Sequence, residues 1–220
     1  MMEGVTDHSP RFRLVVLDVD STLIENEVIE LLAAQAGSLE HVAEITDRAM
    51  RGEMDFSESL RERVATLRGL SIDDLEHVRE HVTVTRGVTE LIRGVHDSGG
   101  HVGVVSGGFH EILDPLAEQL GLDLWRANRL EVRDGQLTGL VSGPIIDAHA
   151  KADTLREWAS DLGVPLEHTV AVGDGANDLA MMEIAGLSIA FDAKPIVVAA
   201  ADAAIYDRDL SVVLDLIGIG

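Results

Sequence analysis

Hydrophobic positions along the chain fall into short continuous runs separated by longer stretches of mixed polarity. The runs are LVVL (14–17), HVGVVS (101–106), TVAVGD (169–174), LSIAF (187–191) and AAIY (203–206). Apolar runs of this length, rich in β-branched residues, are typical of strands buried on both faces of a parallel sheet. Between them apolar residues recur at helical spacing, as at 88–95. This alternation predicts an α/β fold with a doubly wound, mostly parallel sheet.

Two segments interrupt the alternation. Residues 128–143 carry an Asp-Gly pair between alternating residues, which predicts a β-hairpin. Residues 25–83 have helical patterns throughout and follow the first strand directly. Because ligands bind beyond the carboxyl ends of the strands in open parallel sheets, we expect this insertion to cover that edge as a small helical cap.

The expected organisation therefore has three parts. A short flexible tail covers residues 1–12, an α/β core is built from 13–24 and 84–220, and the cap covers 25–83. With 220 residues, 46% of them hydrophobic, the chain is long enough to bury a sizeable core.

Composition restricts the partners. The sequence has 17 Lys and Arg residues against 39 Asp and Glu, a formal net charge of −22, which disfavours nucleic acid and anionic lipid as partners. Any phosphate site must therefore be built locally from cations and N–H groups.

The sequence has no cysteine, no signal-peptide pattern at 1–12 and no apolar run long enough for a membrane span, so we expect a soluble, cytoplasmic protein. Association into a homodimer is left open.

Polar groups, from side chains or from the backbone, collect where three of the predicted strands end. They are Asp18 and Asp20 after the first strand, Ser106 and Gly107 after the second, and Asp174, Asn177 and Asp178 after the third, with Lys151 near the start of a helix. Taken singly, each has an ordinary explanation as a turn former, a helix cap or a solvated lysine. Together they lie at one edge of the predicted sheet and are of chemically compatible types, which favours a catalytic site.

The charges at this edge suggest a chemistry. Crowded carboxylates repel one another, and a divalent cation relieves the repulsion; oxygen ligands favour Mg²⁺. An ammonium from Lys151, the Ser106 hydroxyl and the glycine N–H groups would complete a site for a phosphoryl group. Asp18 could then act as the nucleophile and Asp20 as the general acid and base.

Four motifs resemble, in order, those of the haloacid dehalogenase superfamily of phosphatases: DVDST (18–22), VVSGG (104–108), Lys151 and GDGAND (173–178). The resemblance covers nearly the whole chain and implies a Rossmann-like core. It implies that Asp18 is the nucleophile and Asp20 the general acid and base. It further implies that Mg²⁺ is held by the Asp18 carboxylate, the Asp20 backbone carbonyl and Asp174, with Asp178 in support, and that Ser106 and Lys151 hold the phosphoryl oxygens.

Within this superfamily the chain is similar to the phosphoserine phosphatase family, for instance in SLRERV (59–64) and ANRLEVRDGQLTG (127–139). That likeness implies hydrolysis of O-phospho-L-serine, the last step of serine biosynthesis, through an aspartyl-phosphate. It implies that Glu27 faces the substrate ammonium and Arg63 its carboxylate, and that Met50 and Phe56 close over the site. Gly107 and Asn177 complete the expected substrate contacts. Without the likeness, Glu27 is a helix-start acid and Arg63 a surface residue.

Two alternatives stay open at this point. One is an enzyme of the same fold that acts on another small phosphomonoester such as phosphohomoserine, or that transfers the phosphoryl group to an alcohol. The other is a phospho-signalling module that resembles a receiver domain. The signalling module is disfavoured because Asp20 would speed the loss of a phosphate that has to persist, and because receivers lack a helical cap after the first strand.

Overall fold

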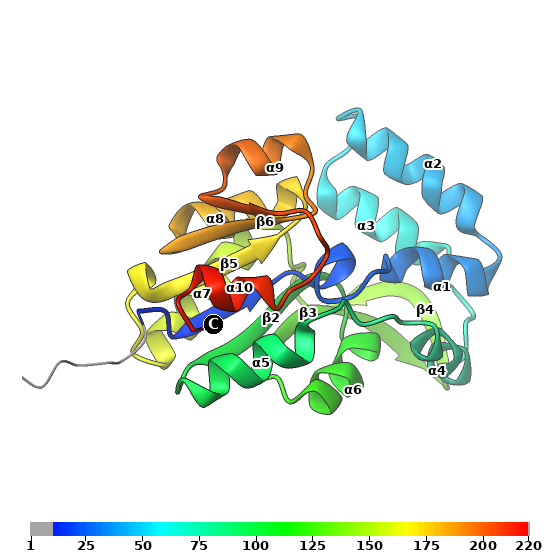
Figure 1. Cartoon of the computed structure of the whole chain (residues 1–220). Helices are drawn as coiled ribbons and strands as arrows, with labels where there is room; N and C mark the ends of the chain where they lie inside the picture. Colours follow the sequence, from blue (N-terminus) through cyan, green and yellow to red (C-terminus); the bar gives the residue numbers. More distant parts are fainter. Residues whose placement is uncertain (1–10, 220) are drawn as a thin grey trace, which may run out of the picture.

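Seven strands form one sheet at the centre of the computed structural model, which describes residues 11–219 apart from the side chain of Met50 (Figure 1). Residues 1–10 of the expected tail lie outside the described residues. The strands are β1 (Leu14–Leu17), β2 (His101–Phe109), β3 (Leu124–Arg133), β4 (Gln136–Ser142), β5 (Thr169–Gly173), β6 (Leu187–Phe191) and β7 (Ala203–Ile205). Their order is β4-β3-β2-β1-β5-β6-β7, and all neighbours are parallel except β3 and β4.

Strand β1 lies in the middle of the sheet and explains the doubly wound arrangement. It pairs with β2 on one side and β5 on the other, so that Leu17 is opposite both Val104 and Val172. Successive side chains of a strand point to opposite faces. Val15 and Leu17 accordingly belong to one hydrophobic cluster, whereas the alternate residues of β1 belong to a second. The predicted α/β sheet is thus confirmed.

Helices cover both faces of the sheet. They are α5 (Val88–Asp97), α6 (His110–Leu120), α7 (Ala148–Asp161), α8 (Leu179–Ile184), α9 (Pro195–Ala200) and α10 (Val212–Leu216). The cluster that includes Leu17 contains residues of α5, α6 and α10, and the other contains residues of α7, α8 and α9. Among residues 11–219, no helix combines the length and apolar character needed to cross a bilayer.

Strand β3 extends further than the sequence pattern predicts. Its first half pairs in parallel with β2, Gly103 opposite Leu124, and its second half forms the predicted hairpin with β4 around Asp134 and Gly135. Both turn residues have positive φ, 52° and 76°, as this turn requires. The first half escaped prediction because residues 124–126 are only half-buried and include Trp and Arg, so no continuous apolar run marks them.

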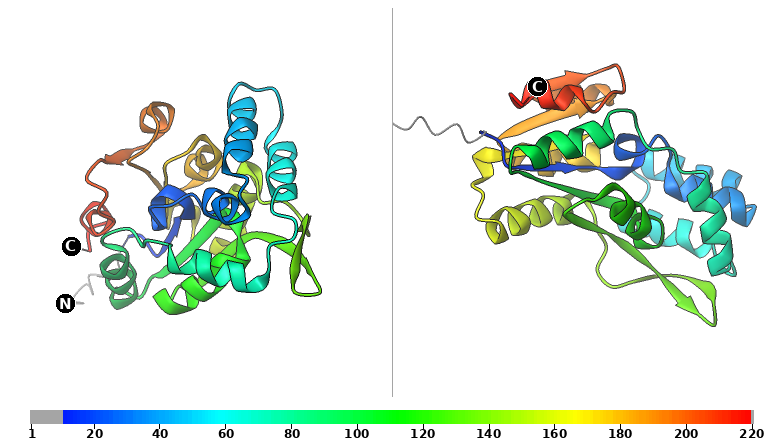
Figure 2. Two further views of the ribbon diagram at one scale, coloured as in Figure 1. Left: turned by 90° about the vertical axis from the view of Figure 1, so that its right-hand side faces the viewer. Right: turned by 60° about the horizontal axis from the view of Figure 1, so that its bottom comes forward.

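Four further helices occupy the segment expected to form the cap. They are α1 (Val28–Ala36), α2 (Leu39–Met50), α3 (Phe56–Ala65) and α4 (Ile72–Glu80), and they lie beyond the carboxyl ends of the strands (Figures 1 and 2). The hydrophobic cluster around Val15 and Leu17 continues into them through Leu32 and Leu60. Treating this segment as a separate domain stays a prediction.

Backbone hydrogen bonds join the cap to the core at its entry and at its far side. At the entry, Ser21 N–H of the core donates to the carbonyl of Asn26 at 3.2 Å, and Glu25 N–H links the two ends of the cap by donating to the carbonyl of Thr83 at 2.9 Å. At the far side, the α3–α4 connection pairs with the outer edge of β4, where Leu137 N–H donates to Leu70 at 2.8 Å. The end of α3 also packs directly on Gly139 of β4, where an added Cβ would lie 3.1 Å from the Cβ of Arg68 and 3.2 Å from the carbonyl oxygen of Ala65.

We therefore expect Gly139→Ala to weaken the contact between α3 and β4. Gly121→Ala is the matched control, because Gly121 has a similar φ (73° against 80°) but open space around it. A left-handed backbone costs an alanine about 1 kcal/mol, and the crowding at Gly139 should add roughly 1 kcal/mol more. Urea titration of both variants measures the difference in free energy of unfolding. Equal losses would contradict the close packing described here.

Candidate active site

The two aspartates after β1 are brought to the same cleft by a tight turn. Asp18 is buried, and its Oδ1 accepts the Val19 N–H at 2.7 Å. The chain then turns through Val19–Leu23, with Ser21 at a φ of 57°. The turn returns Asp20 to the start of α1, where its Oδ1 accepts the Val28 N–H at 3.2 Å. Two carboxyl groups only two residues apart therefore lie in different surroundings.

Lys151 lies buried between two carboxylates. Its Nζ is 2.7 Å from Asp18 Oδ1 and 2.8 Å from Asp178 Oδ1. Asp147 caps the N-terminus of α7 by accepting the Ala150 N–H at 2.9 Å, and this fixes Lys151 in the first turn of that helix. Burial alone would lower the pKa of Lys151, but Asp178 and Asp18 raise it above its ordinary value. The ammonium therefore stays charged at neutral pH.

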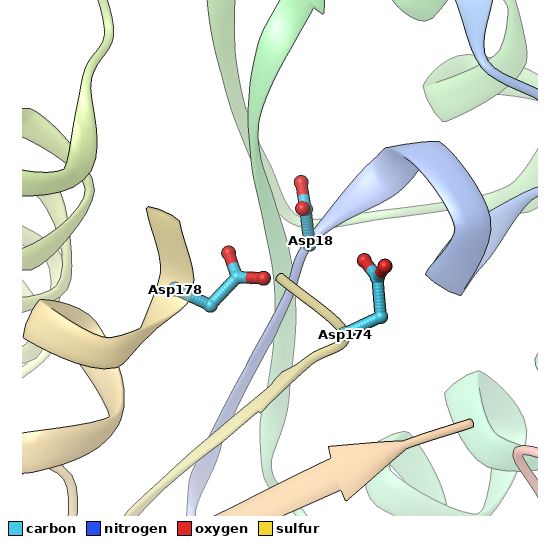
Figure 3. A group of neighbouring side chains, drawn as sticks. All are labelled: Asp18, Asp174 and Asp178. Carbon is cyan, nitrogen blue, oxygen red and sulfur yellow. The ribbon is translucent and has the colours of Figure 1, made fainter. Parts of the chain in front are cut away.

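Three carboxylates gather beyond the ends of β1 and β5. Asp18, Asp174 and Asp178 each offer an oxygen within 4.8 Å of the others (Figure 3). The Asp178 carboxyl lies so close to Gly173 that a Cβ there would be 2.4 Å from it, so only glycine fits at this position. Among residues 11–219, Lys151 is the one cation within 4.0 Å of any of these carboxylates, so the three keep an excess negative charge. An all-oxygen, net negative cluster of this kind could hold a hard divalent cation.

Burial, together with the crowding of carboxyl groups, raises the pKa values of these aspartates. Burial, followed by repulsion from Asp178, holds the pKa of Asp18 well above its usual range, although Lys151 opposes the shift. Burial and the nearby Glu27 raise the pKa of Asp20 to about 7. Burial and Asp178 raise the pKa of Asp174 to about 6. Asp20 can therefore both give and accept a proton near neutral pH.

The irregular end of β2 supplies hydrogen-bonding groups next to Asp20. Ser106 and Gly107, which were expected to follow this strand, lie within it, where its pairing with β3 shifts register between Val105 and Phe109. The buried Ser106 accepts the Gly108 N–H on its Oγ at 2.7 Å, which leaves its own hydroxyl proton to donate elsewhere. A Cβ on Gly108 would lie 3.2 Å from Asp20 Oδ2, and one on Gly107 would lie 3.1 Å from Cζ of Phe56. The two glycines thus let the end of β2 pass between Asp20 and the cap.

Cap residues complete the cleft from the opposite side. Glu27, Phe56 and Arg63 line it together with Asp18, Asp20, Gly107, Asp174 and Asn177. Glu27 occupies the N-cap position of α1, but its side chain caps no N–H; instead its Oε1 accepts the Ser21 hydroxyl at 2.8 Å. Arg63 Nε donates to the carbonyl of Ser59 at 3.3 Å. Within residues 11–219 no carboxylate lies within 4.0 Å of its guanidinium.

The remaining predicted residues lie beneath or beside the cleft. Ser106, Lys151 and Asp178 are buried behind its wall. Met50 ends α2, and the prediction about its side chain falls outside the described part of the structure.

Two residues with a place at this site were not predicted. The fully buried Asn128 in β3 donates from Nδ2 to the carbonyl of Gly107 and accepts the Ile146 N–H on Oδ1, both at 2.8 Å. It thereby ties the irregular end of β2 to the segment that leads into α7. An Asn inside a strand is unusual, and that signal could have revealed it. Lys194 lines the cleft on the core side and is exposed to solvent.

Known proteins resemble this chain over most of its length. A model of the haloacid dehalogenase-like hydrolase family matches residues 15–183. Phosphoserine phosphatase from Streptomyces coelicolor is 55% identical over 96% of the chain, which spans about half (52%) of that relative. Phosphoserine phosphatase from Streptococcus thermophilus is 50% identical over 93% of the chain and 95% of the relative. A solved phospho-aspartyl intermediate analogue of phosphoserine phosphatase matches with a TM-score of 0.87 and 46% identity, over 93% of this chain and 98% of the other.

The raised pKa of Asp174 leads to a prediction about stability without added metal. Its ordinary value is 3.8 and its value in the fold is about 6, so the group favours folding at low pH and this contribution is lost as the pH rises through 6. Asp174→Asn never ionises. In EDTA we expect its melting temperature to exceed that of the original protein at pH 8 by on the order of 5 °C, with the gap closing towards pH 4.

The exposed Asp207, which makes no ion pair within 4.0 Å in the part of the chain that the structure describes, offers the control Asp207→Asn. That variant should follow the original protein across the pH range. Added Mg²⁺ should stabilise the original protein more than Asp174→Asn. A pH-independent gap, or equal stabilisation by Mg²⁺, would contradict the crowding of carboxylates around Asp174.

Proposed function

Because the chain belongs to the haloacid dehalogenase-like hydrolase family, we propose that it is a Mg²⁺-dependent phosphoserine phosphatase, which hydrolyses O-phospho-L-serine to L-serine and inorganic phosphate. The observation that carries the proposal is a single cleft lined by Asp18 and Asp20 from the core and by the Glu27 carboxylate and the Arg63 guanidinium from the cap, the latter without an ion pair among the described residues. The relatives named phosphoserine phosphatase support it, including one that the chain matches over nearly its full length. The reaction belongs to serine biosynthesis in the cytoplasm.

The carboxylate cluster fits the cation that the family implies. Asp18, Asp174 and the backbone carbonyl of Asp20 would hold Mg²⁺, with Asp178 in support. When bound, the ion would offset the charge of the carboxylates and polarise a phosphoryl oxygen. Lys151 adds a fixed positive charge at Asp18 and opposes the rise in its pKa, and the bound cation would lower that pKa further, which favours the ionised form of the nucleophile.

In the first half of the reaction, a carboxylate oxygen of Asp18 bonds to phosphorus while the bond between phosphorus and the serine oxygen breaks. Asp20 gives its proton to that departing oxygen, a role suited to a pKa of about 7. The Ser106 oxygen accepts the Gly108 N–H, which leaves its hydroxyl proton to donate. This hydroxyl binds a phosphoryl oxygen. The products are L-serine and an aspartyl-phosphate on Asp18.

In the second half, Asp20 is the base. It takes a proton from a water molecule, whose oxygen attacks phosphorus. The bond between phosphorus and Asp18 breaks, which releases inorganic phosphate and restores the carboxylate. Asp20 is then protonated again and ready for the next substrate. The Val28 N–H at 3.2 Å keeps its carboxyl group directed into the cleft through both halves.

The two cap charges give the substrate its orientation. An amino acid phosphate carries an ammonium and a carboxylate, and Glu27 and Arg63 offer the opposite charges. The hydrogen bond from Ser21 holds Glu27 close to the catalytic turn. A guanidinium can bind a carboxylate through two parallel hydrogen bonds, which fixes direction as well as charge.

The direct test is a comparison of kcat/KM, with Mg²⁺, for L-phosphoserine, phosphothreonine, phosphoethanolamine, phosphohomoserine and p-nitrophenyl phosphate. We expect a strong preference for L-phosphoserine and full recovery of the phosphate as inorganic phosphate, with or without homoserine as an acceptor. Similar activity on all the esters, or transfer to homoserine, would refute the proposed substrate or reaction and leave the nucleophile assignment standing.

Arg63→Ala should raise KM for L-phosphoserine about tenfold or more, because a charge-assisted hydrogen bond contributes about 1.5–3 kcal/mol. For p-nitrophenyl phosphate, which has no carboxylate, KM should barely change. Arg61→Ala, on the exposed face of the same helix, is the control and should behave like the original protein. An equal effect of Arg63→Ala on both substrates would rule out a carboxylate-binding role.

Asp18→Asn should abolish turnover of every ester, since an amide neither ionises nor attacks phosphorus. The fold should persist, because the Asn side chain can still accept the Val19 N–H and the Lys151 ammonium. Circular dichroism checks the fold, and acid quenching of the original protein with ³²P-labelled substrate should trap the aspartyl-phosphate. Turnover near the original rate in Asp18→Asn would refute the assignment.

A further inference from the structure

Lysine is rare in this chain, and both lysines lie at the candidate active site. Of the 17 cationic Lys and Arg residues only Lys151 and Lys194 are lysines. Lys151 is buried between Asp18 and Asp178, and Lys194 lines the mouth of the same cleft. A chain that uses arginine everywhere else has an ammonium at these two positions. The mechanism above uses only the first of them.

The backbone of Lys194 is fixed to the catalytic edge. Its N–H donates to the carbonyl of Asp174 at 3.1 Å, and Pro195 begins α9 directly after it. The preceding loop is held by an ion pair of 2.7 Å between Asp192 and Arg208. The chain thus fixes where the side chain of Lys194 starts, while that side chain stays exposed to solvent.

The charges that line the cleft suggest a role for the Lys194 ammonium. Asp18, Asp20, Glu27 and Asp174 contribute four carboxyl groups to the wall, against which the only cations in the wall are Arg63 and Lys194, as far as the described residues go. Lys151 lies behind the wall and is engaged by two carboxylates. A phosphate dianion that approaches a protein with a net charge of −22 therefore meets repulsion at the entrance as well as over the surface.

The Lys194 ammonium is in a position to bind that dianion. In the structure of residues 11–219 its ammonium has no carboxylate within 4.0 Å. Its field nevertheless reaches the site: burial, Asp178 and Glu27 raise the pKa of Asp174, and Lys194 opposes that rise. Arg63, the other accessible cation, lies on the cap side and is assigned to the substrate carboxylate.

We propose that Lys194 receives the phosphate group at the mouth of the cleft, guiding the dianion of the substrate past the acidic rim towards Asp18 and binding inorganic phosphate as it leaves. The inference rests on the proposed phosphomonoester hydrolysis but not on serine as the leaving group. A compact ammonium on a flexible four-carbon stem suits this transient task, since it can follow an anion without fixing its orientation.

The test compares Lys194→Ala and Lys194→Arg with Arg93→Ala, which removes one exposed cation from α5, outside the cleft wall. At low ionic strength Lys194→Ala should lower kcat/KM for L-phosphoserine and for p-nitrophenyl phosphate by roughly fivefold, with kcat changed less than twofold. Added KCl should narrow this gap, because salt screens charges over about 10 Å at 0.1 M. Lys194→Arg should restore kcat/KM, and Arg93→Ala should leave it unchanged.

Calorimetric titration with inorganic phosphate in the presence of Mg²⁺ tests the same site without turnover. Lys194→Ala should weaken phosphate binding several-fold, whatever the natural substrate is, so this arm separates a failure of the inference from a failure of the proposed function. Unchanged phosphate affinity, or a kcat/KM gap that persists in high salt, would overturn the inference. So would a defect confined to the Mg²⁺ concentration for half-maximal activity, because Lys194 would then act only by supporting Asp174.

Discussion

The buried contact of Lys151 with Asp18 and Asp178 is the constraint on which the rest of the site depends. Removing two carboxylates from water is costly, and the cost is offset only if a cation lies between them with good geometry. The contact therefore requires that the end of β1, the first turn of α7 and the turn after β5 meet within hydrogen-bonding distance. The Asp147 cap fixes the start of α7, and the absence of a side chain at Gly173 leaves room for the Asp178 carboxyl group. Both help to bring these three segments together.

Because the ammonium neutralises only part of the local charge, the same contact accounts for the chemistry around it. Burial, followed by the excess negative charge, raises the pKa values of Asp18 and Asp174, and that charge makes the cluster suitable for a divalent cation. Asp20 stands apart from the ammonium and is influenced mainly by burial and Glu27. Two aspartates of one motif can thus differ in function because only one of them contacts Lys151.

Much of this arrangement could be predicted from sequence because its signals are local. Short apolar runs identify β1 and β5, the Asp-Gly pair identifies the hairpin, and the aspartates follow their strands directly in the chain. The roles of Asn128 and Lys194 depend instead on contacts between distant segments. Asn128 has its role because the fold places Gly107 and Ile146 within hydrogen-bonding distance of its side chain. No spacing in the sequence predicts these contacts. The first half of β3 lacks an apolar run because its residues are only half-buried.

The pairing of the α3–α4 connection with β4 has a consequence beyond the active site. Strand β4 ends the sheet, and an uncovered edge strand offers its N–H and carbonyl groups to other chains. Here the cap occupies part of that edge through Gly69, Leu70 and Ile72. A variant without the cap would lose the side chains proposed to bind substrate and would also expose an aggregation-prone edge. The segment proposed to enclose the substrate thus also covers part of an edge that could otherwise pair with another chain.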